Sequence, residues 1–374
     1  MKALFVVTSL MGAGHLTRTL ILARAVAAAG ARAVVVSGGR NIPHAAPDGV
    51  ELVQMPPVWS DGVDYSRLLT PGGVADQAYL DARAARLCAA LDEIAPDVIV
   101  TELWPFGRRA LSGEFEALLN HAAGRARVYA SIRDVLEPKR KAKRVEETAA
   151  RLRRWYDGVL VHGDAAVVDL AATWPLAAEF AGGTRYTGYV AAPPPAPIAD
   201  GAGDVLVAVG GGVIGRDLLQ ASIEAARIDA SRAGGRRPRR WRLRVGGVDA
   251  AAEVQRLTAL AVDAPLVVEP AAADYRARLA AASCSLTLFG YNTATDLLAA
   301  GTPAVIAPMD EGGEREQIIR ADAFAGLPGF TRLTARDPRS IAAAVAAATD
   351  GPGPARDLVD LNGAARTAEI LLSG

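Results

Sequence analysis

The sequence predicts an α/β protein built from two doubly wound, Rossmann-like domains that face a central cleft. The chain has 374 residues, which is longer than a single hydrophobic core usually grows. Short apolar runs recur along it without alternating polar residues, which is typical of parallel strands covered on both faces. A proline- and glycine-rich stretch near the middle interrupts this pattern and indicates a domain boundary.

The first half of the chain is expected to form an N-terminal domain, residues 1–190. Strands are expected where apolar residues cluster, at 3–9, 32–37, 97–102, 127–132 and 158–162. Amphipathic segments lie between them and are expected as helices, at 16–29, 76–94 and 114–123. Helices that connect consecutive parallel strands would cover both faces of the sheet.

The linker is expected at residues 191–203, where prolines between 193 and 197 are followed by Gly201 and Gly203. The alternation then restarts and predicts a C-terminal domain over 204–350. Its strands are expected at 205–209, 241–245, 266–268, 285–289 and 304–307. The remaining segment, 351–374, is expected to carry a helix at about 356–372. Whether this helix packs back on the first domain is left open by the pattern.

Composition narrows the class of protein. The chain has 41 basic and 41 acidic residues, so its formal net charge is zero, which argues against a nucleic-acid partner. Cys88 and Cys284 lie far apart in apolar runs and are expected to be reduced. Gly12, His15 and Arg18 interrupt the first apolar region, and no stretch of ~20 apolar residues follows. We therefore expect a cytoplasmic protein.

The first glycine loop, Gly12-Ala13-Gly14-His15, directly follows the first expected strand. Glycines let the backbone approach a ligand, and the helix that follows points its positive end at the same place. His15 can act there as a base or donate to a phosphate, and the alternative is a turn with a capping histidine. The spacing differs from the dinucleotide fingerprint GxGxxG, so no nicotinamide cofactor is expected.

Two further glycine turns follow strands of the second half. Gly210, Gly211 and Gly212 stand at the position that corresponds to the first loop; their alternative role is close packing of a strand and a helix. The turn at Gly290 precedes a short helix, whose first N–H groups can bind an anion. Asp296, farther along this helix, can accept hydrogen bonds from a ribose diol.

Other polar residues also follow expected strands. Glu316 and Gln317 can hydrogen-bond sugar hydroxyls, or can simply begin a solvated helix. In the first half the segments 102–105, which begins with Glu102, and 131–134, with Ser131, Arg133 and Asp134, can face an acceptor or have only a structural role. The basic runs at 139–144 and 236–240 can contact an anionic lipid surface or a phosphorylated acceptor, or form solvated loops. The sequence contains no DxD pattern, so no metal is expected.

These motifs together resemble the GT-B glycosyltransferases, in particular the MurG-like group with its family 28-like C-terminal domain. The chain is closer still to bacterial proteins described as predicted glycosyltransferases. The resemblance extends over nearly the whole chain and is carried by segments in a common order: Gly14-His15-Leu16, 131–136, 156–164, 188–190, 210–212, 290–293 and 316–321.

The resemblance implies that the C-terminal half binds a nucleotide sugar as a substrate, with a UDP-linked sugar as the expected donor. Asp296 would hold the ribose, where the family usually has glutamate. Glu316 and Gln317 fall on the paired glutamines that hold the sugar, of which only the second is retained. The remaining donor contacts would come from the diphosphate loop 210–212, from Glu269 near the base, and from Gly290, Tyr291, Asn292 and Thr293.

On the acceptor side, the resemblance places His15, expected in a catalytic role as a base or as a contact of the diphosphate. From their positions after strands of the first half, we also expect on the acceptor side Gly12, Gly14, Arg18, Glu102, Arg133 and Asp134. The implied reaction is metal-independent transfer of a hexosyl group to an unidentified small molecule, glycan or lipid-linked acceptor. No cofactor is implied.

Three other functions remain open. Hydrolases of UDP-linked sugars share the opening Gly-x-Gly-His-x-x-Arg, which fits Gly12, Gly14, His15 and Arg18. In such an enzyme His15 would position water. A UDP-sugar 2-epimerase uses the same architecture, and a non-catalytic sensor would bind the donor without turnover.

Overall fold

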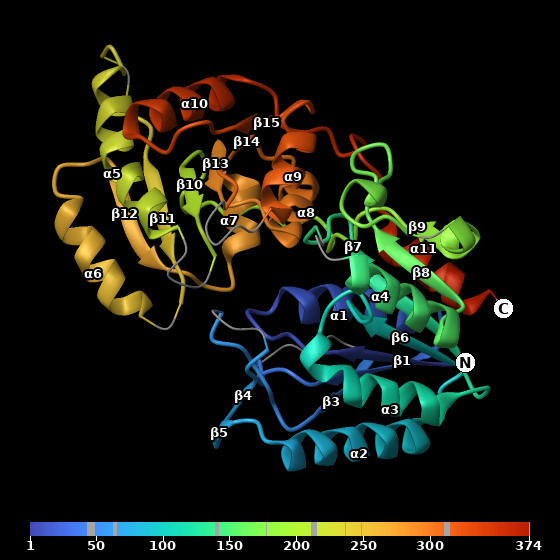
Figure 1. The fold of residues 1–374 in the computed structure, drawn as a ribbon. Coiled ribbons are helices and arrows are strands. Elements are labelled where there is room, and N and C mark those ends of the chain that lie inside the picture. Colours follow the sequence, from blue (N-terminus) through green and yellow to red (C-terminus); the bar gives the residue numbers. More distant parts are fainter. Residues whose placement is uncertain are drawn as a thin grey trace. The chain divides into compact units, whose positions relative to one another are not determined.

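The computed structural model describes residues 1–42, 49–62, 66–138, 142–176, 178–210, 215–235, 237–247, 249–309 and 315–373. The chain divides into two compact units, each built around a parallel sheet (Figure 1). The first unit comprises Met1–Ala191 and Asp360–Gly374, and the second comprises Ala192–Val359. Within the described residues, every helix is too short or too polar to cross a membrane.

The sheet of the first unit has the strand order β3-β2-β1-β6-β7-β8-β9, with all neighbours parallel. This is the doubly wound order, which reverses direction between β1 and β6. The strands are β1 (Lys2–Val7), β2 (Arg32–Ser37), β3 (Val50–Gln54), β6 (Val98–Glu102), β7 (Arg127–Arg133), β8 (Gly158–His162) and β9 (Thr184–Tyr186). A small hairpin of β4 (Leu69–Thr70) and β5 (Gly73–Val74) stands apart from it.

Helices bury both faces of this sheet because successive side chains of a strand point to opposite sides. Ala3, Phe5 and Val7 of β1 pack toward α1 (Gly14–Ala28) and α11 (Gly363–Leu372). Leu4 and Val6 pack toward α2 (Gln77–Ile94) and α3 (Ser112–Ala122), which lie side by side (Figure 1). Helix α4 (Ala142–Trp155) packs against β7 and β8.

The second unit repeats the doubly wound order as β12-β11-β10-β13-β14-β15. Its strands are β10 (Val205–Ala208), β11 (Trp241–Val245), β12 (Leu266–Pro270), β13 (Cys284–Thr287), β14 (Ala304–Ile306) and β15 (Phe330–Arg332). Its helices are α5 (Arg216–Ser231), α6 (Ala250–Leu260), α7 (Tyr275–Ala281), α8 (Tyr291–Ala300), α9 (Glu316–Phe324) and α10 (Pro338–Asp350). The main core of this unit lies between the sheet and α5, α6 and α10. Phe289, Phe324 and Phe330 pack edge to face in a separate cluster.

The structure differs from the sequence-based expectations mainly at sheet edges and helix starts. Strands β3, β9 and β15 were not expected from the sequence, because they are short or half-exposed and contain few consecutive apolar residues. Helix α1 begins at Gly14, two residues earlier than expected, so His15 lies in its first turn. Strand β12 extends to Pro270, which places Glu269 in the strand rather than in the loop after it.

Candidate active site

Each sheet has a point at which its strand order reverses, and the loops that follow the two central strands diverge there. Ligands of doubly wound sheets bind at such points, at the carboxyl ends of the strands. In the first unit these strands are β1 and β6, which are followed by His15 and end at Glu102 respectively. In the second unit they are β10 and β13, which are followed by Gly210 and Gly290.

His15 and Glu102 form a hydrogen-bonded pair at the reversal point of the first sheet. Nδ1 of His15 lies 2.9 Å from Oε1 of Glu102. Arg18, one turn farther along α1, donates to the same carboxylate oxygen. The side chains of Arg18 and Glu102 are each 2% exposed and that of His15 is 13% exposed. The imidazole is therefore the member of this group that a ligand can reach.

Glu102 is also bonded from the inside of the sheet. Ser131 Oγ donates to Oε2 of Glu102 over 2.7 Å, and the two residues are direct partners on β6 and β7. Nε2 of His162, the last residue of β8, lies 3.0 Å from Ser131 Oγ. Nδ1 of His162 lies 2.8 Å from Thr187 Oγ1. Ser131 lies in the segment 131–134 that was expected to face an acceptor, but it bonds Glu102 instead. No local pattern assigned chemistry to His162 or Thr187, because only the pairing of the strands brings them to this site.

The surroundings keep the partly exposed His15 and the buried His162 neutral, and Glu102 ionised, at neutral pH. Burial, reinforced by the charge of Arg108, lowers the pKa of His15 to about 3. Burial and Arg18 likewise lower the pKa of His162 to about 3. Burial alone would raise the pKa of Glu102. However, Arg18 and the hydrogen bonds from His15 and Ser131 outweigh it and hold that pKa well below its usual range.

These charges determine the tautomer of His15. An ionised carboxylate only accepts hydrogen bonds, so Nδ1 of the neutral imidazole donates to Glu102. Nε2 then has no proton and is available as a base. The loop after β6 holds Leu103 and Arg108 at φ values of 67° and 58°, a left-handed conformation that non-glycine residues rarely adopt. Such strain often accompanies functional sites.

Of the other residues expected on the acceptor side, three are at least partly exposed and one is fully buried. Gly12 is exposed at φ 58°, and a Cβ atom there would meet open space. Gly14 begins α1 and is half-exposed. Arg133 ends β7 and is half-buried, whereas Asp134 is fully buried and accepts a hydrogen bond from the backbone N–H of Val135. In this structure Asp134 serves the turn after β7 and offers no surface to an acceptor.

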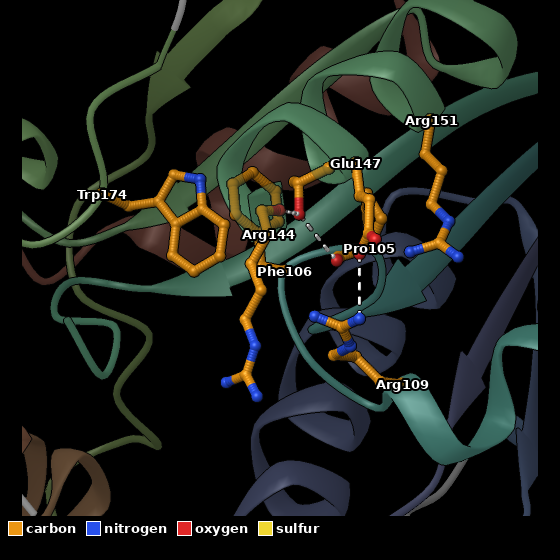
Figure 2. Close-up of a pocket in the computed structure, with 8 residues that line it drawn as sticks. Pro105, Phe106, Arg109, Arg144, Glu147, Arg151 and Trp174 are labelled. Carbon is orange, nitrogen blue, oxygen red and sulfur yellow. Dashed lines mark hydrogen bonds and ion pairs between the residues drawn. The ribbon is translucent and has the colours of Figure 1, made fainter. Parts of the chain in front are cut away.

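A small pocket lies between the loop after β6 and α4 (Figure 2). The pocket volume is about 10 Å³, which is room for a single water molecule. Arg109 donates to Glu147 across it over 2.9 Å. The other lining residues are Pro105, Phe106, Arg144, Thr148, Arg151 and Trp174. The pocket is too small to hold a sugar.

In the second unit, helix α8 begins at the turn where an anion site is expected. Gly290 is the N-cap of this helix and has no side chain to bond the first turn. Tyr291 is buried, and Asn292 and Thr293 are half-buried in the first turn. Gly210 follows β10 at φ 77° with open space where a Cβ would be. Gly211 and Gly212 lie outside the described residues.

The carboxylate of Asp296 accepts a hydrogen bond from an arginine. Oδ1 accepts from Nε of Arg276 over 2.7 Å, and the side chain of Asp296 is 20% exposed. Nη2 of Arg276 also donates to the carbonyls of Ala192 and Pro193, at 3.1 and 2.8 Å. Burial raises the pKa of Asp296, and Arg276 opposes that rise. The described contacts of Asp296 use Oδ1, so Oδ2 remains the better placed oxygen for a ribose hydroxyl.

The expected sugar contacts are bonded within the protein. Glu316 is buried and pairs with Arg320 over 2.8 Å. Oε1 of Gln317 accepts from the backbone N–H groups of Phe289 and Met309, at 3.0 and 3.2 Å, and so ties together the loops after β13 and β14. The carboxamide of Gln317 can offer a ligand only its N–H donors. Glu316 is more consistent with a structural role than with sugar binding.

Glu269 is held in an ion-pair network on the sheet. Its carboxylate accepts from Arg242 and from its cross-strand partner Arg244, the latter over 2.6 Å. Burial would raise the pKa of Glu269, but hydrogen bonds from the two arginines outweigh it and lower that pKa. Any contact of this segment with a base would therefore come from its backbone rather than from this side chain.

Comparison with known proteins identifies the fold. No protein-family model matches the sequence, and no curated protein matches it. Solved structures match it over nearly its whole length. A glycotransferase of kitacinnamycin superposes with a TM-score of 0.61 and 18% identity, covering 99% of this chain and 97% of that one. MurG of Acinetobacter baumannii superposes with a TM-score of 0.54 and 14% identity, covering 100% of both chains. The chain has the GT-B fold.

The expected resemblance to GT-B glycosyltransferases is thus confirmed for the fold. The same GT-B fold also matches a Listeria monocytogenes protein assigned by inference to the UDP-N-acetylglucosamine 2-epimerases. That match has a TM-score of 0.55 and 12% identity, over 98% of this chain and 90% of the other. The fold alone does not decide the reaction, which must be argued from the site.

Proposed function

We propose that this GT-B protein is a glycosyltransferase that moves a sugar from a nucleotide-sugar donor to a hydroxyl group of an acceptor. The observation that carries the proposal is the His15–Glu102 pair at the reversal point of the first sheet. A neutral imidazole, oriented by a buried carboxylate, with its outer nitrogen unprotonated, is suited to general-base catalysis.

In the proposed reaction, Nε2 of His15 takes the proton of the acceptor hydroxyl as its oxygen bonds to the anomeric carbon. The bond between that carbon and the diphosphate breaks, and its electron pair leaves with the diphosphate. The proton remains on His15, and Glu102 stabilises the resulting imidazolium. With a pKa of about 3, His15 of the free enzyme is unprotonated at neutral pH but is a weak base. The proposed reaction therefore requires the negative charge of the bound diphosphate to raise the pKa of His15 in the complex.

The donor is proposed to bind at the second unit, with its diphosphate at the start of α8 and at Gly210. Backbone N–H groups there can stabilise the negative charge that develops on the leaving diphosphate; losing one such donor typically costs about 3 kcal/mol of activation free energy. Asp296 would receive the ribose through Oδ2. We propose that no divalent metal is needed, and an excess of EDTA should leave the rate unchanged.

A thermal-shift screen of UDP-, TDP- and GDP-sugars tests donor binding. We expect one nucleotide class to raise the melting temperature and Asp296→Ala to abolish that rise. No stabilisation by any of them would contradict the proposal.

The release of nucleoside diphosphate from the stabilising donor then tests the reaction class. Release that depends on added acceptor hydroxyl compounds supports transfer, whereas equal release without acceptor identifies a hydrolase. His15→Ala should reduce turnover by 10²-fold or more, on the order of what a general base contributes. Unchanged turnover would remove His15 from the mechanism.

A further inference from the structure

The hydrogen bonds that lead from Thr187 through His162 and Ser131 to Glu102 can be assigned one donor and one acceptor at each step. Ionised Glu102 has no proton to give, so Ser131 donates its single hydroxyl proton to Oε2. Ser131 Oγ must then accept from Nε2 of His162, 3.0 Å away. Nδ1 of neutral His162 is left unprotonated and accepts from Thr187 Oγ1 over 2.8 Å, a shorter contact than those from that hydroxyl to the carbonyls of Gly188 and Val161, at 3.1 and 3.4 Å.

This chain is deep within the first unit. His162 and Thr187 are 0% exposed and Ser131 is 1% exposed. Buried polar groups cost free energy unless each one is bonded, and apolar side chains of similar size would pack in such a core without that cost. The chain leads from the interior to Glu102, and from Glu102 to the imidazole of His15.

We propose that Ser131 and His162 are positioning residues that hold the Glu102 carboxylate in place and thereby fix the Nδ1-protonated tautomer of His15. Without the hydroxyl of Ser131, Oε2 of Glu102 would lie buried with an unmade hydrogen bond, and rotation toward Arg18 would relieve it. His15 would then lose the fixed acceptor that selects its tautomer. The catalytic consequence rests on the proposed function, but the tautomer itself does not.

The test is ¹⁵N NMR of histidine-labelled protein, which distinguishes protonated from unprotonated ring nitrogens. In the unaltered protein we expect His15 to carry its proton on Nδ1 and His162 on Nε2. The opposite tautomer at either residue would overturn the proposal without any variant.

Variants then test the linkage. Ser131→Ala and His162→Leu should shift the ring ¹⁵N signals of His15 toward a mixture of tautomers. His162→Gln should preserve them, because the glutamine N–H group can replace Nε2–H as the donor to Ser131. Ser222→Ala removes an equally buried serine of the second unit and controls for general loosening. Unchanged His15 signals in folded Ser131→Ala or His162→Leu would overturn the proposal; if one variant does not fold, the other and the wild-type tautomers carry the test.

Turnover provides a second readout once an acceptor is known. Ser131→Ala should lower kcat by roughly 10- to 100-fold at nearly constant KM, because the base is misaligned while substrate contacts remain. His162→Gln should restore most of the activity that His162→Leu loses. A protein that shows the predicted tautomers but no transfer would refute the proposed function and leave the positioning roles intact.

Discussion

At the scale of single residues, the site depends on histidines that the protein keeps neutral. The ionised carboxylate of Glu102 is bonded by His15, which a ligand can reach, and by the buried Arg18. His162 supports this group from within the sheet through Ser131. Keeping His15 and His162 uncharged costs stability in acid, because the unfolded chain would protonate both of them freely.

This cost predicts a pH dependence of stability. The pKa of each histidine is about 3 in the folded protein and about 6.5 when unfolded, so between these values the unfolded chain binds more protons. The free energy of unfolding should therefore fall as pH falls below 6.5, by up to about 2 kcal/mol per histidine between pH 6.5 and 5. Glu102, whose pKa is lowered, would lose its contribution only in stronger acid.

Urea unfolding at pH 7 and pH 5 measures this effect. The loss of unfolding free energy on acidification should be smaller in His162→Gln than in the unaltered protein by about 2 kcal/mol. Ser222→Ala, at a buried serine that does not titrate in this range, is the control and should lose as much as the unaltered protein. Equal losses in all three proteins would show that His162 is not kept neutral by the fold.

At the scale of elements, the start of α8 offers a test of the anion site. Gly290 has φ −69°, an ordinary value, and a Cβ atom there would meet nothing within 4 Å. Among the described residues, neither backbone conformation nor packing requires glycine here, which is consistent with the proposed approach of a diphosphate. At Gly210 the φ of 77° is itself a reason, because a side chain there costs about 1–2 kcal/mol.

Gly290→Ala should therefore lower stability by no more than about 1 kcal/mol, the usual range for a helix cap, while it reduces the thermal shift produced by the nucleotide sugar. Gly113→Ala, in α3, also adds a methyl group into open space and should leave the shift unchanged. Donor stabilisation that survives in Gly290→Ala would place the diphosphate elsewhere.

At the scale of the whole molecule, the helix α11 follows the second unit in the sequence but packs in the first unit. The side chain of Leu371 in α11 is fully buried, and its carbonyl accepts from Arg127 of β7 over 2.7 Å. Tyr189 donates its backbone N–H to the carbonyl of Asp360 over 2.7 Å, and thereby joins the two segments of this unit.

Leu371→Ala should therefore destabilise the first unit by about 2–5 kcal/mol, the usual cost of emptying a buried leucine site. Hydrogen exchange followed by mass spectrometry should show faster exchange in peptides from α1 and β1 and little change in α5 and α10. Leu260→Ala, at a site that is 44% exposed, is the control and should change neither. Faster exchange confined to the second unit would contradict the assignment of α11.

The sequence patterns predicted the central strands of both sheets well, because apolar runs of buried parallel strands are local signals. They failed at β3, β9 and β15, where pairing at the edge rather than side-chain type defines the strand. They also singled out His15, Glu102 and Asp296 individually. They did not predict that Arg276 would donate a hydrogen bond to the carboxylate of Asp296, since these two residues are brought together only by the packing of α7 on α8.

Periodicity and glycine placement, both local properties, by themselves determined that this chain forms two Rossmann-like halves with glycine turns after their central strands. Tertiary structure alone decided which polar side chains meet. His15, Glu102, Ser131 and His162 come from separate segments, and parallel pairing of β1, β6, β7 and β8 brings them into one hydrogen-bonded row. In the second unit, packing pairs the partly buried Glu269 with Arg244 and the buried Glu316 with Arg320, because a carboxylate removed from water is stable only beside a positive charge.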